Sequence, residues 1–337
     1  MLPTLIPQTT RVALARRSDR RVRLFGNDVA ETRIEYGLGE ERREGWWGDY
    51  VQGATQWLAA SGWTIGGFEA YVESDVPIGS GLSSSAALTV ALLRALRLAF
   101  RLSLDDVALA KACQQIENGF VGARVGIMDP FVIAVGRSGE ALLLDTRSLE
   151  WQSIPIPFAS VDLLVVSSGV THRNAAAGGY NTRRAECEAA RELLGVRSLR
   201  DVDAWTFRNG GQLPPPLEAR VRHVVSENAR VLAAVEALRM ADVRALGRLL
   251  TASHASLRDD YEVSVPEIDF LVERVTTDDR VFGARITGGG FGGSMVALTE
   301  PATAIAVGGR LVAEYARKFP REATLLVAGS PATGRSD

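Results

Sequence analysis

A glycine- and serine-rich loop, PIGSGLSSSAA, covers residues 77–87 and runs directly into an apolar stretch rich in alanine and leucine. The residues before the loop alternate as a strand does, and those after it predict a helix. Glycines let a ligand approach the backbone closely, and the free N–H groups at a helix start attract anions. The pattern therefore indicates an anion cradle, for which a phosphate group is the natural ligand.

The same residues allow a simpler interpretation, because serines commonly cap helices that follow a flexible turn. The loop is also not a P-loop, since Leu82 stands directly after Gly81, where a P-loop carries lysine. Neutralisation of phosphate charge would then depend on Mg²⁺, the helix terminus and arginines. The candidate phosphate-binding residues are Gly79, Ser80, Gly81, Leu82, Ser83, Ser84 and Ser85.

A second glycine cluster, at residues 288–293, formally matches the GxGxxG pattern of dinucleotide-binding folds. Those folds require a helix after the glycines, whereas the following SMVALTE is short and strand-like. The cluster is either a tight turn between two strands or a backbone segment that must approach a ligand or another loop. Its glycines are Gly288, Gly289, Gly290, Gly292 and Gly293.

The elements that must position these loops form a mixed pattern of strands and helices. In the first part, strands are predicted at RVALARR, RRVRLF, FEAYVESDVP and ALLLDTR, and helices at WWGDYVQGATQWLAASG, ALTVALLRALRLAF and LDDVALAKACQQIEN. In the second part, strands are predicted at VDLLVVSSG, in the glycine-rich stretch and at ATLLVAG, and helices near residues 181–195, 217–238, 240–256, 265–277 and 303–318. A soft boundary near residue 158 divides the chain into predicted domains 1–157 and 158–337.

Composition excludes several classes of function. The chain has 337 residues and a net charge of -2, so it lacks the basic excess that drives binding to nucleic acid or an anionic membrane. It shows no signal-peptide pattern and no apolar run approaching about 18 residues. The two cysteines, Cys113 and Cys187, lack metal-ligand spacing and fit a reducing compartment. We therefore expect a cytoplasmic protein that binds neither nucleic acid nor membrane.

With their surroundings, the two glycine loops resemble those of the GHMP small-molecule kinases, which include galactokinase, homoserine, mevalonate and phosphomevalonate kinases. PIGSGLSSSAA is similar to the nucleotide loop of that superfamily, and RITGGGFGGSMVAL to its C-terminal glycine motif. The stretches CQQIENGFVGARVGIMDPFVIAVGRSGEALLLDTRSLEW and SSGVTHRNAAAGGYNTRRAECEAA resemble the galactokinase family over long runs. The resemblance covers nearly the whole chain. It implies an α+β fold of two domains, the first strand-rich and similar to domain 2 of ribosomal protein S5, the second ferredoxin-like.

The resemblance also implies an activity, which is ATP-dependent phosphorylation of a sugar at its C1 hydroxyl. Galactose is the expected substrate, with arabinose or a uronic acid as alternatives, and a mevalonate-type kinase is disfavoured by GIMD and YNTRRAE. ATP phosphates are expected against residues 79–85, and Mg²⁺ on Ser85 and Glu117, whose oxygen ligands suit that hard cation. The protein is expected to be a monomer.

Three more residues match family positions at the sugar. Asp129 falls on the catalytic base, while Gly126 and Tyr180 fall on positions that contact the substrate, as Asp129 also does. Without the resemblance, Glu117 would be interpreted as a solvated charge at a helix end, Asp129 as a cap or surface charge, and Tyr180 as a half-buried aromatic. The apolar neighbours of Asp129 independently favour a partly buried carboxylate.

The sequence departs from the family at a few places. Pro130 stands where glutamine is usual and Ser294 where cysteine is common, and neither is expected to carry the chemistry. The family's N-terminal signature, an arginine followed by Gly-Glu-His-x-Asp-Tyr, has no counterpart here. A misplaced start, a truly shortened gene and a sensor that lost catalysis would each explain this, and the intact loops, base and metal residues favour the first. As it stands, the chain is expected to bind Mg·ATP weakly and to transfer phosphate very slowly or not at all.

Overall fold

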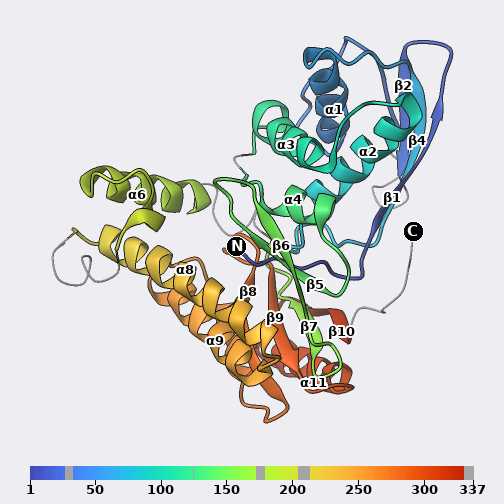
Figure 1. Cartoon of the computed structure of the whole chain (residues 1–337). Helices are drawn as coiled ribbons and strands as arrows, with labels where there is room; N and C mark the ends of the chain where they lie inside the picture. Colours follow the sequence, from blue (N-terminus) through green and yellow to red (C-terminus); the bar gives the residue numbers. More distant parts are fainter. Residues whose placement is uncertain (27–32, 124, 172–178, 204–212, 330–337) are drawn as a thin grey trace.

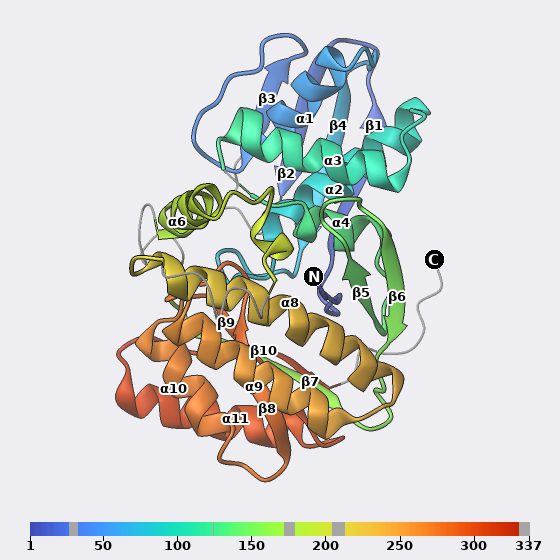
Figure 2. The same cartoon turned by 60° about the vertical axis from the view of Figure 1, so that its left-hand side comes forward.

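The molecule has two parts, each made of a β-sheet and helices and each built from one half of the sequence, and they lie one above the other (Figure 1, Figure 2). The computed structural model describes residues 1–26, 33–123, 125–171, 179–203 and 213–329, and leaves the side chain of Tyr180 outside that description. The first half contains β1 (Thr10–Arg16), β2 (Arg21–Gly26), β3 (Ile34–Gly37), α1 (Gly48–Ala60), β4 (Phe68–Ser74), α2 (Ser84–Phe100), α3 (Asp106–Ile116), the π-helical turn η1 (Glu117–Val121), α4 (Met128–Val135), β5 (Glu140–Leu144) and β6 (Trp151–Pro155).

The first sheet has the strand order β1-β4-β2-β3. Although β1 and β2 follow each other in sequence, they do not pair, because β4 lies between them, antiparallel to β1 and parallel to β2. Alternation fixes the faces of the sheet: Val22 and Leu24 of β2 are fully buried, whereas Arg21 is exposed. The buried face packs with α1, α2, α3 and α4 into one apolar cluster, which fixes α2 and thereby the loop from which it starts.

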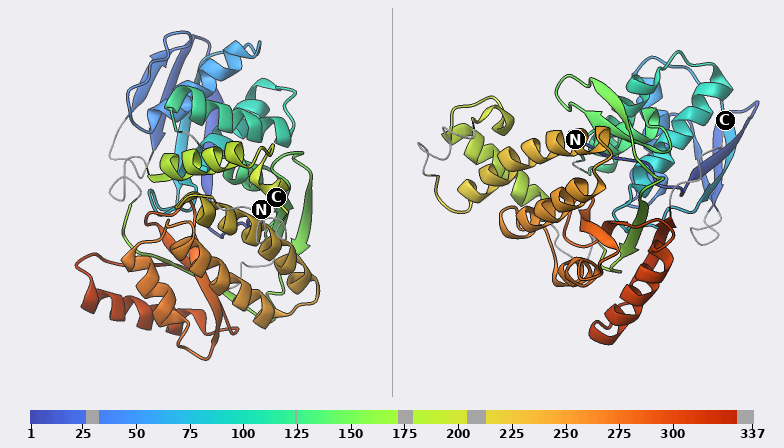
Figure 3. Two further views of the ribbon diagram at one scale, coloured as in Figure 1. Left: turned by 90° about the vertical axis from the view of Figure 1, so that its left-hand side faces the viewer. Right: turned by 60° about the horizontal axis from the view of Figure 1, so that its bottom comes forward.

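The second half contains the elements on which the other glycine cluster lies. They are β7 (Asp162–Ser167), α6 (Gly179–Leu193), the 3-10 turn η2 (Leu199–Asp201), α8 (Leu217–Arg239), α9 (Val243–Asp259), α10 (Pro266–Val275), β8 (Val281–Thr287), β9 (Ser294–Thr299), α11 (Ala304–Lys318) and β10 (Thr324–Gly329). In several views α6 lies at the level where the two halves meet (Figure 2; Figure 3, left).

The second sheet is antiparallel, with the order β10-β7-β9-β8. Numbered along this half, that order is 4-1-3-2, the arrangement of a ferredoxin-like domain, as the family resemblance implied. Successive residues of β7 face opposite sides: Leu164 packs with α10 and α11, and Leu163 with α8 and the start of α9. Both faces are therefore covered by helices (Figure 3).

The antiparallel pair of β5 and β6 stands between the two halves. Ala141 of β5 and Ile154 of β6 pack into the same apolar cluster as β7 and α8. A division of domains between residues 157 and 158 stays a prediction. No helix in the described part of the chain is both long and apolar enough to cross a lipid bilayer.

Candidate active site

The loop that leads into α2 has an unusual backbone. Gly79 and Gly81 have φ of 74° and 76°, and Ser83, the residue before the helix, is also left-handed with φ of 63°. In the described structure the Ser83 side chain makes no capping hydrogen bond to α2. The interpretation of this serine as an ordinary helix cap is therefore wrong. The first N–H groups of α2 stay available to an anion.

Two members of the predicted phosphate-binding set use their side chains within the protein. The hydroxyl of Ser80 donates to the carbonyl of Pro77 over 2.8 Å, and Ser80 is only 5% exposed. Leu82 packs against the apolar cluster shared by β5, β6 and β7. These two side chains hold the loop in shape, and contact with a ligand there is left to the backbone.

Glu117 lies where α3 changes into the π-helical turn η1. Such π turns are rare and occur frequently at functional sites. The Glu117 side chain is buried, with 3% of the residue exposed, and Ser85 Oγ donates to its Oε2 over 3.3 Å. Burial raises the pKa of Glu117 to about 7, the Ser85 hydrogen bond opposes that rise, and the charge of Asp129 adds to it. A buried carboxyl thus faces the start of α2.

Asp129 lies in the first turn of α4 and is half-buried. Burial raises the pKa of Asp129, and a hydrogen bond from the Ser83 side chain acts in the opposite direction. The prediction of a partly buried carboxylate is confirmed. Since Asp129 also influences Glu117, the structure brings both carboxylates to one place, each next to a different serine of the phosphate loop.

Gly126 lies just before α4 and is exposed. A methyl group placed on Gly126 would meet no described atom within 4 Å, so open space adjoins this residue. Tyr180 belongs to the first turn of α6, and its side chain lies outside the described residues. Its neighbour Gly179 packs closely on Phe291: a Cβ on Gly179 would lie 2.8 Å from the Phe291 ring.

The second glycine cluster is the turn between β8 and β9, so no helix follows it and the dinucleotide interpretation is excluded. The same turn packs on the phosphate loop. A Cβ on Gly288 would lie 2.8 Å from the carbonyl oxygen of Gly81, and one on Gly293 would lie 3.2 Å from that of Ser80. Only glycine allows this approach of two backbones. Both interpretations of the cluster, a tight turn and a segment that approaches another loop, are therefore confirmed.

The remaining glycines of the cluster divide between packing and exposure. Cβ atoms on Gly290 and Gly292 would lie 2.6 Å from Val263 and 2.5 Å from the carbonyl of Val170, respectively, whereas Gly289 is exposed. Gly290 and Gly292 therefore fix the turn against the second half of the molecule.

Ser294, the first residue of β9, is a residue whose contribution the sequence did not indicate. It is fully buried, and its Oγ donates to the carbonyl oxygen of Ser80 over 2.7 Å. This bond joins the two glycine loops across 214 residues of sequence. A small polar side chain directly after a glycine run was the only available signal.

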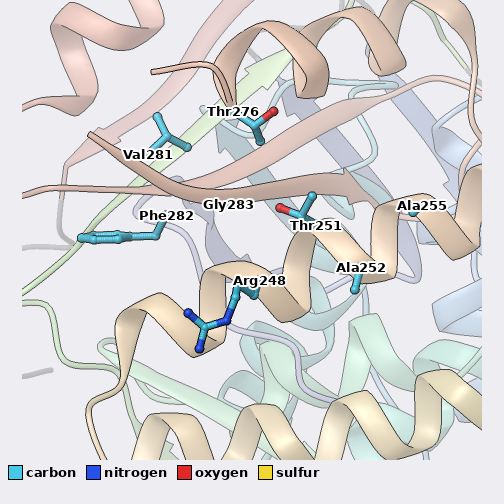
Figure 4. A pocket seen from close by; sticks show the side chains of 8 residues that line it. All are labelled: Arg248, Thr251, Ala252, Ala255, Thr276, Val281, Phe282 and Gly283. Atoms are coloured by element: carbon cyan, nitrogen blue, oxygen red, sulfur yellow. The ribbon is translucent and has the colours of Figure 1, made fainter. Parts of the chain in front are cut away.

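A separate pocket lies between α9 and β8 (Figure 4). It is open and none of the predicted site residues lines it, so it is not the site described above. Its lining residues are Arg248, Thr251, Ala252, Ala255, Thr276, Val281, Phe282 and Gly283.

Comparison with known families agrees with this geometry. Residues 49–137 match the model of the GHMP kinase N-terminal domain and residues 234–317 that of the GHMP kinase C-terminal domain. The chain is 41% identical over 334 residues to a galactokinase of Roseiflexus sp. and 42% identical over 336 residues to one of Chloroflexus aurantiacus, in each case covering 97% of this chain and 85% of the relative.

Solved structures also match galactokinase and, more distantly, other GHMP kinases. The structure of Lactococcus lactis galactokinase complexed with galactose superposes with a TM-score of 0.92 at 30% identity, covering 98% of this chain and 87% of the other. A mevalonate kinase, at 18% identity and a TM-score of 0.61, shares the fold, with 93% of this chain and 87% of the other covered. On these matches the chain belongs to the galactokinases, a family of sugar kinases within the GHMP kinases.

Proposed function

We propose that the protein transfers the γ-phosphoryl group of ATP to the C1 hydroxyl of galactose, giving galactose 1-phosphate. The observation that carries the proposal is the convergence of two carboxylates on the serine loop. Ser85 donates to Glu117 over 3.3 Å, the charge of Asp129 reaches Glu117, and Ser83 lies close enough to Asp129 to oppose the rise in pKa that burial causes there. The proposed phosphate-binding loop thus lies next to both Glu117, which could bind a metal ion, and Asp129, which could act as a base.

The backbone of the loop supports ATP binding. Gly79, Gly81 and Ser83 are left-handed, and no side chain caps the start of α2 in the described chain. Exposed N–H groups in such a turn, together with the positive end of the helix dipole, suit the oxygens of a polyphosphate. ATP is also the phosphate donor expected of a GHMP kinase.

The pair of Ser85 and Glu117 fits Mg²⁺. That ion is usually held by one or two protein oxygens together with substrate phosphates, and not by a cage of side chains. Accordingly, the described residues contain no cluster of three or more metal-binding side chains, yet Glu117 is buried without a paired cation and its pKa is raised to about 7. Ser85 and Glu117 would hold the ion, which would supply positive charge against the negative charge that develops on the transferring phosphoryl group.

Asp129 is proposed to accept the proton of the sugar hydroxyl as that oxygen attacks phosphorus. A carboxylate whose pKa is raised by burial is a stronger base than one in water. Asp129 lies in the first turn of α4, which packs into the apolar cluster of the first half, and Ser83 of the phosphate loop lies close enough to act on the pKa of Asp129. In-line attack then requires the sugar to lie between Asp129 and the loop.

The open space beside Gly126 supports a sugar at this position, and the likeness to a galactokinase crystallised with galactose makes galactose the first candidate. Tyr180, at the start of α6, is proposed as a second sugar contact.

The free thiols Cys113 and Cys187 agree with the cytoplasmic location expected from the sequence.

Replacing the base tests the proposal. Relative to the rate of the unchanged chain, which the sequence predicts to be slow, Asp129→Asn should lower kcat for galactose by roughly 10²–10⁴ while leaving Mg·ATP affinity, measured by calorimetry, unchanged. Asp105→Asn is the matched control: Asp105 caps α3 by accepting from the Ala108 N–H, a bond that asparagine can also make, so its kcat should stay at the starting value. Near-full activity of Asp129→Asn would refute the assignment. A panel with arabinose and galacturonate, run on the unchanged protein, identifies the acceptor sugar.

A further inference from the structure

The N-terminal ends of helices α2 and α4 both lie at the candidate active site. α2 begins at the phosphate loop and α4 begins at the proposed base, where Ser83 and Asp129 interact. α4 has eight residues, little more than two turns, and a helix of that length has little stability of its own. Its axis, and hence the place of Asp129, must be fixed by contacts along its length and at its far end.

A single arginine makes the contact at the far end. Nη2 of Arg94, on α2, donates to the carbonyl oxygens of Ala134 over 2.8 Å and Ile133 over 3.3 Å. These carbonyls belong to the last turn of α4, where backbone acceptors lack partners within the helix. A cation at this position also complements the negative end of the helix dipole. Arg94 is half-buried, so this contact is not a fully solvated one.

The spacing along the two helices places the Arg94 contact at the end of α4 that is distant from Asp129. Arg94 lies nine residues after Ser85, which is about 13.5 Å along a helix, and Ala134 lies five residues after Asp129, about 7.5 Å. The apolar cluster of the first half packs the two helices side by side, and at the far end of α4 the Arg94 side chain donates to its last carbonyls. The Arg94 contact therefore restrains the C-terminal end of α4 against α2.

We propose that Arg94 is a positioning residue for Asp129: by holding the C-terminal end of α4 against α2, it fixes the distance between the base and the phosphate loop. This inference rests on the proposed function of Asp129. A displacement of about 1 Å at the reacting groups can cost 10²-fold in rate. Loss of the contact should therefore lower kcat, whereas the groups that bind ATP and sugar keep their own supports.

Another arginine on the same helix offers a matched control. Arg97 Nη1 donates to the carbonyl of Leu104 over 3.1 Å and pairs with Asp106 over 2.7 Å, so it joins α2 to the start of α3. It shares the guanidinium, the helix and a backbone carbonyl acceptor with Arg94, but its partners do not lie on α4. A purely structural contribution of such arginines would appear equally in both variants.

The experiment compares Arg94→Met, Arg94→Lys and Arg97→Met in the full chain by kcat, both KM values and thermal stability. Arg94→Met should lose about 10- to 100-fold in kcat, with both KM values within twofold. Lysine keeps the charge but has a compact ammonium group in place of the planar guanidinium. Arg94→Lys should therefore have a higher kcat than Arg94→Met and a lower one than the unchanged protein. Arg97→Met should lose stability and keep kcat within twofold.

A kcat of Arg94→Met within twofold of the unchanged protein, or an equal kcat loss in Arg97→Met, would overturn the inference. If Arg94→Met does not fold, Arg94→Lys decides: about a three- to tenfold loss of kcat supports the inference, and none overturns it. Asp129→Asn is assayed in parallel. Normal activity of that variant overturns the proposed function, whereas its loss together with a normal Arg94→Met overturns the positioning alone.

Discussion

The bond between Ser294 and Ser80 offers a quantitative test of how the two glycine loops cooperate. Ser294→Ala removes a hydroxyl that is fully buried and lies 2.7 Å from the Ser80 carbonyl oxygen. Removing one partner of a buried hydrogen bond costs about 1–3 kcal/mol. We expect the free energy of unfolding to fall by that amount. Part of the same cost should appear in ATP binding, because the nucleotide must then order a loop that has lost its anchor.

Calorimetric titration with Mg·ATP and thermal denaturation measure the two effects. The ATP dissociation constant should rise about three- to tenfold, since about 1.4 kcal/mol corresponds to tenfold. Ser168→Ala is the matched control: Ser168 is equally buried and donates over 2.8 Å to the carbonyl of Gly293, which lies in the glycine turn and not in the phosphate loop. It should lose stability with little change in ATP affinity. If Ser294→Ala loses stability but binds ATP within twofold of the unchanged protein, the bond does not order the phosphate loop.

Four further outcomes are expected. Gly126→Ala should raise the KM for galactose without lowering thermal stability, because the added methyl meets no described protein atom; an unchanged KM would remove the sugar from that position. Glu117→Gln should raise the Mg²⁺ concentration needed for half-maximal activity. The raised pKa of Asp129 should place the acid limb of the kcat/KM profile above the usual aspartate range of about 3.9, with activity falling as pH falls, because only the ionised carboxylate accepts a proton. Arg220→Met should lower the free energy of unfolding in urea by about 3–5 kcal/mol, because Arg220 is 1% exposed and pairs with Glu186 over 2.6 Å.

Hydrophobic periodicity, together with the positions of glycine-rich turns, predicted the long helices and strands well. The apolar run after the phosphate loop became α2 (Ser84–Phe100), and the helix predicted at LDDVALAKACQQIEN became α3 (Asp106–Ile116), where Asp105 accepts from the Ala108 N–H. The two strands around the glycine cluster became β8 and β9. In these segments local sequence and tertiary packing favour the same structure, so each can be predicted without knowledge of its neighbours.

Short elements escaped prediction because tertiary contacts decide them. β3 has four residues, β6 begins at Trp151 and ends at a proline, and α4 has eight residues, apolar except for Asp129, with Pro130 in its first turn. A run of that length does not distinguish a strand from a buried helix by periodicity. The π turn at Glu117 was also not predicted, and neither was the place of β4 between β1 and β2. Each depends on residues distant in sequence.

The glycine turn between β8 and β9 shows why a motif can be visible in sequence while its partner is not. Glycine is required there because the backbones of Gly288 and Gly81 touch, and the sequence records only one side of that requirement at a time. The resemblance to a kinase family supplied the site residues, but it gave Ser294 only as a departure that is not expected to carry the chemistry. In the structure that side chain joins the second half of the chain to the phosphate loop of the first. The phosphate loop is therefore shaped by residues from both halves, and substitutions in the distant turn should alter ATP binding without touching the nucleotide.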